Sequence, residues 1–418
     1  MLVTNAQGDS SLITDPVKIK QAANDHFRTI AGAPPTIRIS LSDMTPFWNS
    51  VYTPVADIQT SIYNELLSPP SDDEWRATIA SLPNNKAAGP SGISYEMFKN
   101  LSHLSSNYLK DIIIECFRTG CIPSQWKDAT IYPIPKPTDW NCSLKNTRPI
   151  CLLETARKLM TKIMNNRLAN ILHSHNLLKG NNFAGLPGGS CHTPIHILES
   201  ILYDATSNNK PLFIFLQDIS KAFDSIDTNM LRLAMNRLRI PPLFTQLVMS
   251  LFTNRSNKVI TADGLSDPYK VQIGIDQGEV ISPLLWVIYI DPLLTALNNV
   301  NTTPYNMSSS DFSSPLSSSE IPNTDITINT STLAFMDDIT LISSSMEGLV
   351  NMLNLANEFY AMNNKKINFS KAELITNRDP SNGSKILPVP LPFTFNLDTS
   401  SFTITPIAPH SFFCFLGV

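Results

Sequence analysis

The stretch 332–342 alternates apolar and polar positions in a way that predicts two short strands joined by a tight turn. The apolar residues that recur at every second position are Leu333, Phe335, Ile339 and Leu341. Because a period of two is typical of strands, the adjacent carboxylates Asp337 and Asp338 fall at the turn. Two neighbouring carboxylates repel each other, and a divalent cation would compensate their charge. The alternative is an ordinary surface turn, since aspartate is a favoured turn residue.

A third carboxylate, Asp218, follows the continuous apolar run 212–216, the pattern of a strand buried on both faces. An ionised carboxylate at the end of such a strand is costly unless it is paired or bound to a metal. Asp218 lies far from Asp337 in the sequence, so only the fold can bring the two together. Together they could hold two Mg²⁺ ions for in-line attack on a phosphate.

Apolar residues spaced three and four apart predict the helices of this chain. The helices are expected over 16–30, 71–82, 107–119, 155–173, 192–204, 231–238, 284–297 and 349–360. The helix 284–297 is apolar on nearly every side and is expected beneath a sheet. The stretch 31–70 has no clear period and predicts a linker or arm. The stretch 298–331, crowded with Ser, Thr and Asn, predicts a disordered or loosely ordered insertion.

Two cations stand at neighbouring ends of a predicted pair of strands. Lys136 ends the first strand and Arg148 begins the second. They suit a triphosphate, the lysine as a point charge and the arginine as a bidentate fork, although each alone could be a solvated surface charge. The Gly/Pro-rich loop 84–93, which carries Lys86, could bind phosphate or simply connect two helices.

Length and composition set limits on the class of protein. The 418 residues allow two or three domains, and 42% hydrophobic residues are typical of a globular protein. No stretch has the roughly 18 apolar residues of a membrane span, and the N-terminus has no secretory signal pattern. Six cysteines without zinc spacing indicate reduced thiols in an intracellular protein. The net charge of −4 gives no global basic signature, so nucleic-acid binding would need a local basic groove.

Several motifs in one order resemble the reverse transcriptase domain of non-LTR (LINE-type) retrotransposons. The matching motifs are NKAAGPSGI at 85–93, YPIPK at 132–136, RPI at 148–150, FLQDISKAFD at 215–224, QG at 277–278, SP at 282–283, FMDD at 335–338, NFSK at 368–371 and FLGV at 415–418. Any one of them is a weak signal, but so many in register make the resemblance specific.

The resemblance implies an α+β right-hand polymerase fold. The palm would be an antiparallel sheet with helices packed beneath it, joined to helical and β fingers, and the thumb is expected to be absent. The domains would be an N-terminal helix with a linker or arm over 1–70, fingers over 71–210, and a palm over 211–418 that contains the insertion 298–331.

The resemblance also implies a catalytic group of residues. Asp218 and Asp337 would bind metal together with the carbonyl oxygen of Ile219, and Asp338 would support them. Lys371 would be the general acid for the leaving pyrophosphate. The cofactor would be two Mg²⁺ ions, which Mn²⁺ could replace.

A second implied group would bind the incoming nucleotide. Lys136 and Arg148 would hold its triphosphate, and Gln277 with Gly278 would line it. Phe223 would be the aromatic gate beneath the sugar that rejects a 2′-OH.

This chain departs from the family pattern at three positions. Met336 stands where the family usually has a small residue, and Gly189 where it usually has arginine. Glu279 replaces a serine or another small residue. A carboxylate there, near the nucleotide, could weaken triphosphate binding by like charge.

The function implied is an RNA-directed DNA polymerase of a non-LTR retroelement. Its partners would be an RNA template, a DNA or RNA primer, dNTPs, and thumb or endonuclease regions of a longer polyprotein, in a nuclear or cytoplasmic ribonucleoprotein and without a membrane. One alternative is a degenerate or domesticated polymerase fold that binds RNA without turnover, which Glu279 and the expected lack of a thumb favour. Another is an RNA-templated RNA polymerase, against which Phe223 argues.

Overall fold

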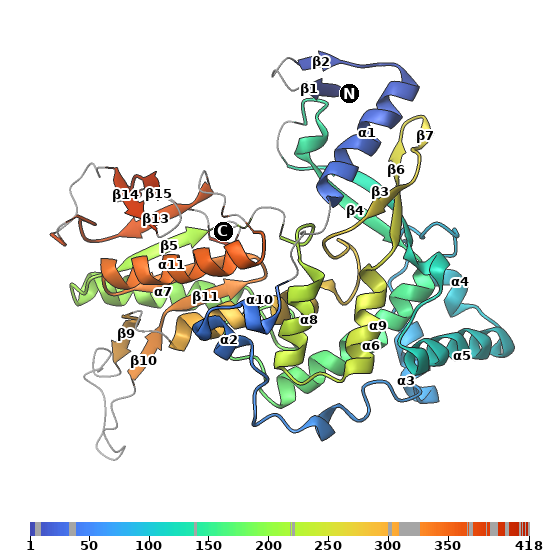
Figure 1. The fold of residues 1–418 in the computed structure, drawn as a ribbon, viewed down its shortest axis with the longest axis horizontal. Coiled ribbons are helices and arrows are strands. Elements are labelled where there is room, and N and C mark those ends of the chain that lie inside the picture. The colour runs from blue at the N-terminus through green and yellow to red at the C-terminus, as the bar shows by residue number, and fades with distance from the viewer. Residues whose placement is uncertain are drawn as a thin grey trace. The chain divides into compact units, whose positions relative to one another are not determined.

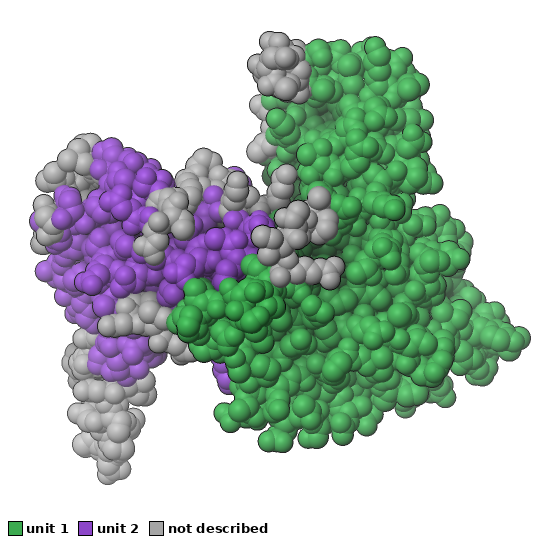
Figure 2. All heavy atoms as spheres, in the orientation of Figure 1, with its two compact units in different colours: residues 1–177, 223–286 green, residues 178–222, 287–418 purple. Residues whose placement is uncertain are grey.

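The computed structural model divides the chain into two compact units (Figure 2). The first unit comprises residues 1–177 and 223–286, and the second comprises residues 178–222 and 287–418. The structure describes the chain except residues 5–9, 33–38, 138–139, 218, 220–221, 300–302, 309–326, 366, 368–370, 382, 385–391, 398–400, 409–410, 412, 414 and 417–418. Each unit combines two segments of chain, and the division into fingers and palm stays a prediction.

A four-stranded antiparallel sheet is the centre of the second unit (Figure 1). Its strands, in spatial order, are β11 Thr332–Phe335, β12 Asp338–Ser343, β5 Phe213–Gln217 and β13 Glu373–Thr376. The predicted hairpin and the predicted buried strand are therefore confirmed, and they are direct neighbours. The register places Ile339 of β12 opposite Gln217, the last residue of β5.

Strand β5 is buried on both of its faces, as its apolar run predicts. On one face Ile214 packs into a cluster with Leu198 and Ile201 of helix α7 His192–Ser207. On the other face the Phe215 ring meets rings from the hairpin of β14 Phe393–Asn396 and β15 Ser401–Ile404. Burying one phenylalanine side chain contributes about 1.5 to 3 kcal/mol, so this strand holds the sheet and both layers together.

Two further helices complete the core of the second unit. Helix α11 Met346–Met362 packs on the Phe215 face, where Tyr360 accepts a hydrogen bond from Gln217 through its hydroxyl oxygen at 3.0 Å. Helix α10 Ser282–Asn299 is buried along nearly all of its length, as its apolar sequence predicts. The Tyr289 and Phe359 rings join α10 to α11 edge to face, with centroids 6.2 Å apart.

The ends of the predicted insertion 298–331 are ordered, which corrects that expectation where the structure describes the chain. Strand β9 Tyr305–Ser308 pairs with β10 Thr327–Thr330 in an antiparallel hairpin. The Tyr305 hydroxyl donates to the buried carboxylate of Asp204 at 2.6 Å. A single buried tyrosine anchors the hairpin, which is too small a signal to stand out in a Ser/Thr/Asn-rich sequence. The central residues 309–326 lie outside the described residues.

The sheet of the first unit has five strands. In spatial order β4 Thr147–Leu153, β3 Asp128–Pro135, β6 Arg255–Thr261 and β7 Gly264–Leu265 are neighbours, and β8 Tyr269–Val271 also pairs with β6. Helix α1 Pro16–Ala31 covers one face of this sheet through Ala23 and Phe27. Asp15 caps α1 by accepting from the backbone N–H of Lys18, as a capped amphipathic helix predicts.

Further helices of the first unit are α2 Pro46–Tyr52, α3 Asp72–Ala80, α4 Tyr95–Lys99, α5 His103–Thr119, α6 Thr155–Ser174, α8 Thr228–Arg237 and α9 Pro242–Phe252. Short additional elements are the hairpin of β1 Leu2–Thr4 with β2 Ser10–Leu12 and four 3₁₀ turns. Each predicted helix is present, and its ends lie within four residues of the observed ones; α5, α8 and α11 begin earlier than expected, and α7 ends later. None of the helices that the structure describes combines the length and apolar character needed to cross a membrane.

The stretch 31–70, expected to be a linker or arm, is packed into the first unit where it is described. Helix α2 buries Trp48 and Tyr52, each 1% exposed. Tyr63 and Leu66 are buried further along the same stretch. A helix of two turns is too short for the spacing of its buried residues, Trp48 and Tyr52, to be recognised as a period.

Candidate active site

The two adjacent carboxylates lie at the predicted hairpin. Met336 and Asp337 form the turn between β11 and β12, and Phe335 is paired with Asp338 across it. Asp337 is half-buried and Asp338 is exposed. Met336 has a φ of 56°, in the left-handed region that disfavours a bulky side chain. The turn therefore holds a strained residue directly before the first carboxylate.

The end of β5 lies beside this turn. Gln217 stands opposite Ile339, one residue beyond Asp338. Asp218 is the next residue in the sequence after Gln217, and it lies outside the described residues. The following residue, Ile219, is described and forms an antiparallel bridge with Ile367.

Lys371 stands near the same end of β5 along the chain. It is exposed, and it comes two residues before Glu373, the first residue of β13. Glu373 is paired with Leu216 near the end of β5. Because β13 runs antiparallel to β5, the backbone that precedes Glu373 approaches the end of β5.

The two predicted triphosphate ligands are neighbours in the first unit. Strands β3 and β4 pair so that Ile134 stands opposite Arg148. The backbone N–H of Lys136 donates to the carbonyl of Asn146 at 2.8 Å, which continues the pairing past the strand end. Both cationic side chains are exposed. The structure thus brings Lys136 and Arg148 together at one end of the β3–β4 pair.

The loop 273–279, which we call the Gln277 loop, joins the remaining predicted nucleotide residues. The carbonyl of Gln277 accepts from the N–H of Cys151 on β4 at 2.8 Å. The N–H of Ile275 donates to the carbonyl of Phe223 at 3.0 Å. The Gln277 amide donates to both carboxylate oxygens of Asp224 at 3.1 Å. The loop is therefore hydrogen-bonded both to the strand that carries Arg148 and to the turn that carries Phe223.

Gly278 is required in this loop by space and by conformation. Its φ of 116° is one that residues with a side chain rarely adopt. A Cβ atom there would lie 2.8 Å from the carbonyl oxygen of Cys151. Any larger residue would push the Gln277 loop off β4.

Phe223 is half-buried beside a large aromatic residue. Its ring centroid lies 5.6 Å from that of Trp286, with 31° between the planes. Trp286 itself is fully buried, so it supports one side of the Phe223 ring. The ring is thereby restrained, as a steric gate needs to be.

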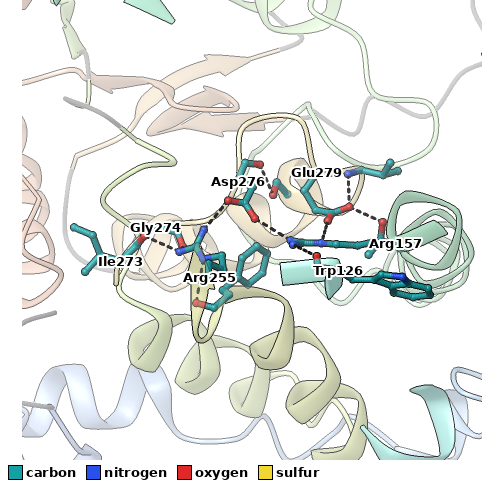
Figure 3. Close-up of polar contacts among 11 residues, drawn as sticks. Trp126, Arg157, Arg255, Ile273, Gly274, Asp276 and Glu279 are labelled. Carbon is teal, nitrogen blue, oxygen red and sulfur yellow. Dashed lines mark hydrogen bonds and ion pairs between the residues drawn. The ribbon is translucent and has the colours of Figure 1, made fainter. Parts of the chain in front are cut away.

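Four buried charged residues, two of them in the Gln277 loop, pair with one another, and we call them the ion cluster (Figure 3). They are Arg157, Arg255, Asp276 and Glu279, each exposed by 3% or less. The Arg157 Nε atom lies 2.6 Å from Glu279 Oε2, and its Nη2 atom lies 2.8 Å from Asp276 Oδ2. The other Asp276 oxygen is 2.7 Å from Arg255 Nη1. Two cations thus neutralise two anions.

The ion cluster keeps its charges although it is buried. Burial by itself raises the pKa of Asp276, but the nearby Arg255 and Arg157 outweigh burial and hold that pKa below its usual value of 3.8. Burial by itself lowers the pKa of Arg157. The carboxylates of Glu279 and Asp276 outweigh burial and raise that pKa above its usual value. Removing one partner of such a buried pair strongly destabilises the protein, because it leaves the other charge uncompensated.

The ion cluster anchors the Gln277 loop on both sides of Gln277. Asp276 precedes that residue, and Glu279 follows Gly278. Arg255 also donates to the carbonyls of Ile273 at 2.8 Å and Gly274 at 2.7 Å (Figure 3). Buried side chains therefore fix the backbone of the loop, while Gln277 itself remains partly exposed.

The family of this chain follows from a comparison of its sequence with known proteins. The family model described as "Reverse transcriptase (RNA-dependent DNA polymerase)" matches residues 134–417. This chain belongs to the reverse transcriptase family. The match contains all the residues singled out for catalysis and nucleotide binding.

Three relatives of this chain come from transposable elements. It is 22% identical to the "Transposon TX1 uncharacterized 149 kDa protein" of Xenopus laevis over 87% of this chain and 26% of that protein. It is 28% identical to the "Probable RNA-directed DNA polymerase from transposon BS" of Drosophila melanogaster over 52% of this chain and 24% of that protein. It is 23% identical to the "Retrovirus-related Pol polyprotein from type-1 retrotransposable element R2" of Nasonia vitripennis over 68% of this chain and 25% of that protein. The chain spans about a quarter of the length of these relatives.

Reverse transcriptases generally use divalent metal ions, and the donors at the hairpin of this chain fit one. Carboxylate oxygens are hard ligands that suit Mg²⁺. Within the part of the chain that the structure describes, no three His, Cys, Asp or Glu side chains gather as a metal site. The third predicted ligand, Asp218, lies outside that part, so the ligand set of Asp218, Ile219 and Asp337 stays a prediction.

Two departures from the reverse transcriptase pattern have a structural explanation. Glu279 is expected from the sequence to repel a triphosphate, but it is buried, paired with Arg157 and hydrogen-bonded by Thr161, which corrects that expectation. At Gly189 a Cβ atom would lie 2.6 Å from the carbonyl oxygen of Phe183. This chain therefore has no room for an arginine there unless the backbone moves.

Sequence reasoning missed Arg157, Arg255 and Asp276. One signal was available for Arg157, which lies on the same side of α6 as the buried Met160 and Met164. A charged residue inside an apolar helical stripe indicates a buried partner. The partner itself, Glu279, could not be recognised because the two are 122 positions apart.

The Gly/Pro-rich loop 84–93 is packed against the junction between β4 and α6. Ser91 donates through its N–H and its hydroxyl to the two carboxylate oxygens of Glu154, at 2.8 and 2.6 Å. A Cβ atom on Gly89 would lie 2.5 Å from the backbone of Leu153. Packing accounts for the glycine and the serine, and a phosphate-binding role for Lys86 stays a hypothesis.

Proposed function

We propose that this chain is the RNA-directed DNA polymerase domain of a non-LTR retroelement. It would extend the 3′-OH of a DNA or RNA primer with dNTPs, copying an RNA template by phosphoryl transfer at two Mg²⁺ ions. The observation that carries the proposal is that two segments far apart in the sequence are neighbours in one sheet. The hairpin with Asp337 and Asp338 pairs with β5, the strand that leads directly into Asp218.

The catalytic roles follow from the chemistry of the donors. Asp218, Asp337 and the carbonyl of Ile219 would hold the metal ions, and Asp338 would support this arrangement. When bound, the ions stabilise the attacking and leaving oxygens of an in-line displacement. Lys371 would protonate the leaving pyrophosphate. We assign the sheet of the second unit to the palm.

The roles in nucleotide binding draw on the first unit. Lys136 and Arg148 would bind the triphosphate, one by charge and one by a bidentate contact. Gln277 and Gly278 would line the nucleotide, and Phe223 would exclude a 2′-OH. The hydrogen bonds that connect the Gln277 loop to β4 and to Phe223 support their joint action. We assign the β3–β4 pair to the fingers, and we place the protein in a nuclear or cytoplasmic ribonucleoprotein.

The alternative of a fold that binds RNA without turnover loses one of its arguments. Glu279 is neutralised inside the ion cluster, and it adds no repulsive charge at the triphosphate. Asp337, Asp338, Lys136 and Arg148 are all retained.

Primer extension tests the proposed function. The purified protein is incubated with dTTP and oligo(dT) annealed to poly(rA), with Mg²⁺ and with EDTA. The proposal expects extension that needs both the RNA template and the metal. A protein that binds the primer–template but adds no nucleotide at any Mg²⁺ or Mn²⁺ concentration would support the alternative.

A further inference from the structure

Lys365 is a buried cation of the second unit that the roles above do not use. It stands three residues after the end of α11 and is 5% exposed. Its Nζ atom donates to the carbonyl oxygen of Ala222 at 2.6 Å. The same atom lies 5.4 Å from the centroid of the Tyr289 ring. Burying an ammonium group is costly unless it is compensated, and both contacts offset part of that cost.

A second contact joins the same two segments of chain. Two residues after Lys365, Ile367 forms an antiparallel bridge with Ile219. Ile219 and Ala222 both belong to the segment that follows β5. Lys365 and Ile367, which follow α11, thus contact Ala222 and Ile219, the two described residues between Asp218 and Phe223.

The segment 219–222 separates two parts of the proposed active site. It follows the proposed metal ligand Asp218 and leads into the proposed sugar gate Phe223. The carbonyl group of Ala222 and the N–H of Phe223 belong to one planar peptide unit. A hydrogen bond that fixes the Ala222 oxygen therefore also fixes the orientation of the peptide plane that contains the Phe223 nitrogen. On its other side, the Phe223 carbonyl accepts from Ile275.

We propose that Lys365 is a positioning residue that sets the backbone between the metal-binding strand end and the sugar gate. Its bond to Ala222 is short and charge-assisted, which makes it stronger than a bond between neutral groups. Lys365 touches neither substrate nor metal in this role, and it acts through the peptide unit that leads into Phe223. The proposal rests on the proposed function, because a sugar gate matters only in a polymerase.

The matched variants are Lys365→Met and Lys210→Met. Methionine keeps the length of the side chain and removes its charge and its donors. Lys210 lies in the same unit and pairs with the buried carboxylate of Asp204 at 3.1 Å, away from the segment 219–222. Both variants are expected to lower the melting temperature, so a general loss of stability is matched between them.

The deciding quantity is the preference for dNTP over rNTP, measured as the ratio of the two kcat/KM values. In Lys365→Met we expect this ratio to fall by about 10- to 100-fold, because small misplacements of a positioned group cost this much. In Lys210→Met the ratio should equal that of the parent. An unchanged ratio in a folded, active Lys365→Met protein would overturn the proposal. If that variant does not fold, Lys365→Gln, which keeps a neutral donor, is measured in the same way.

Amide hydrogen exchange tests the positioning without any turnover. The N–H groups of Ile226 and Ile275 both donate to the Phe223 carbonyl. They should exchange faster in Lys365→Met than in the parent or in Lys210→Met. If the parent extends no primer, the proposed function fails and this exchange alone decides whether Lys365 positions the segment. Equal exchange in all three proteins would refute that positioning.

Discussion

Arg157 and Glu279 form a fully buried ion pair, with 2.6 Å between Nε and Oε2, that joins helix α6 to the Gln277 loop. Asp276 and Arg255 extend the pair into a cluster of balanced charge. The loop can present Gln277 and Gly278 in one fixed conformation because these charges hold its backbone from below. The ion cluster thereby connects the stability of the first unit to its proposed role in nucleotide binding.

A double-mutant cycle on Arg157→Met and Glu279→Gln tests this connection. Either single change leaves one buried charge uncompensated and should lower the free energy of unfolding by about 3 to 5 kcal/mol. The double variant retains the balanced Arg255–Asp276 pair, so it should be more stable than the sum of the single effects predicts. Urea unfolding measures the three values.

The control for this cycle is the exposed pair Arg118–Glu115 on α5. Its coupling free energy should be close to zero, as is usual for exposed surface pairs. A coupling for Arg157 and Glu279 no larger than that of the control would show that the ion cluster does not hold the loop.

The pKa of Asp276 predicts how the stability of the first unit depends on pH. Its pKa in the folded protein lies below that of the unfolded chain. Such a carboxyl contributes stability that is fully present above the unfolded pKa, about 3.9, and is lost as the pH falls through the folded value. Urea unfolding between about pH 6 and pH 3 should therefore show a loss of stability at the acid end that is weaker in Asp276→Asn. Identical pH profiles for parent and variant would contradict the assignment.

The thiol of Cys151 reports whether the Gln277 loop is in place. Burial, reinforced by Asp276 and Asp224, raises the pKa of Cys151 well above its usual value of 9.0. We expect iodoacetamide at about pH 8 to modify the exposed Cys121 in the native protein and to leave Cys151 unmodified. In Glu279→Gln the loop should loosen and Cys151 should become reactive. Peptide mass spectrometry would show this, and equal protection of Cys151 in both proteins would argue against the loop's dependence on Glu279.

Phe223 is proposed to set the choice of sugar. In Phe223→Ala the space under the sugar opens, so incorporation of rNTP relative to dNTP should rise because the exclusion is steric. The comparison is made by steady-state incorporation of single nucleotides. Phe47→Ala, a change at an exposed aromatic residue of α2, is the control and should leave the ratio unchanged. The gate assignment does not survive if Phe223→Ala has the same ratio as the parent.

The sequence is sufficient to predict the hairpin at Asp337 and the buried strand β5, because each has a local signature. A period of two and a continuous apolar run can both be recognised within a few residues. Local patterns predict these elements, and the resemblance to a family then assigns them to one predicted active site.

The interactions that the sequence does not reveal join distant parts of the chain. The two acidic partners of Arg157 lie more than a hundred positions away, so the sequence alone does not reveal that Glu279 is paired. Trp48 and Tyr52 lie on a helix too short to show a period, and Tyr305 is one anchor in a polar stretch. In the sequence Lys365 cannot be distinguished from a surface lysine, because its contact with Ala222 is formed only by the fold.

The central claim is that Asp337 binds catalytic metal. It is tested most directly by single-turnover primer extension on an RNA template across a range of Mg²⁺ concentrations. The parent and Asp263→Asn, a change at an exposed turn between β6 and β7, should extend the primer equally. Asp337→Asn should fold with an unchanged melting temperature and lose at least about 1000-fold in rate, since a lost ligand removes several kcal/mol of transition-state stabilisation. Extension by Asp337→Asn at the rate of the parent, with the same dependence on Mg²⁺, would contradict the account.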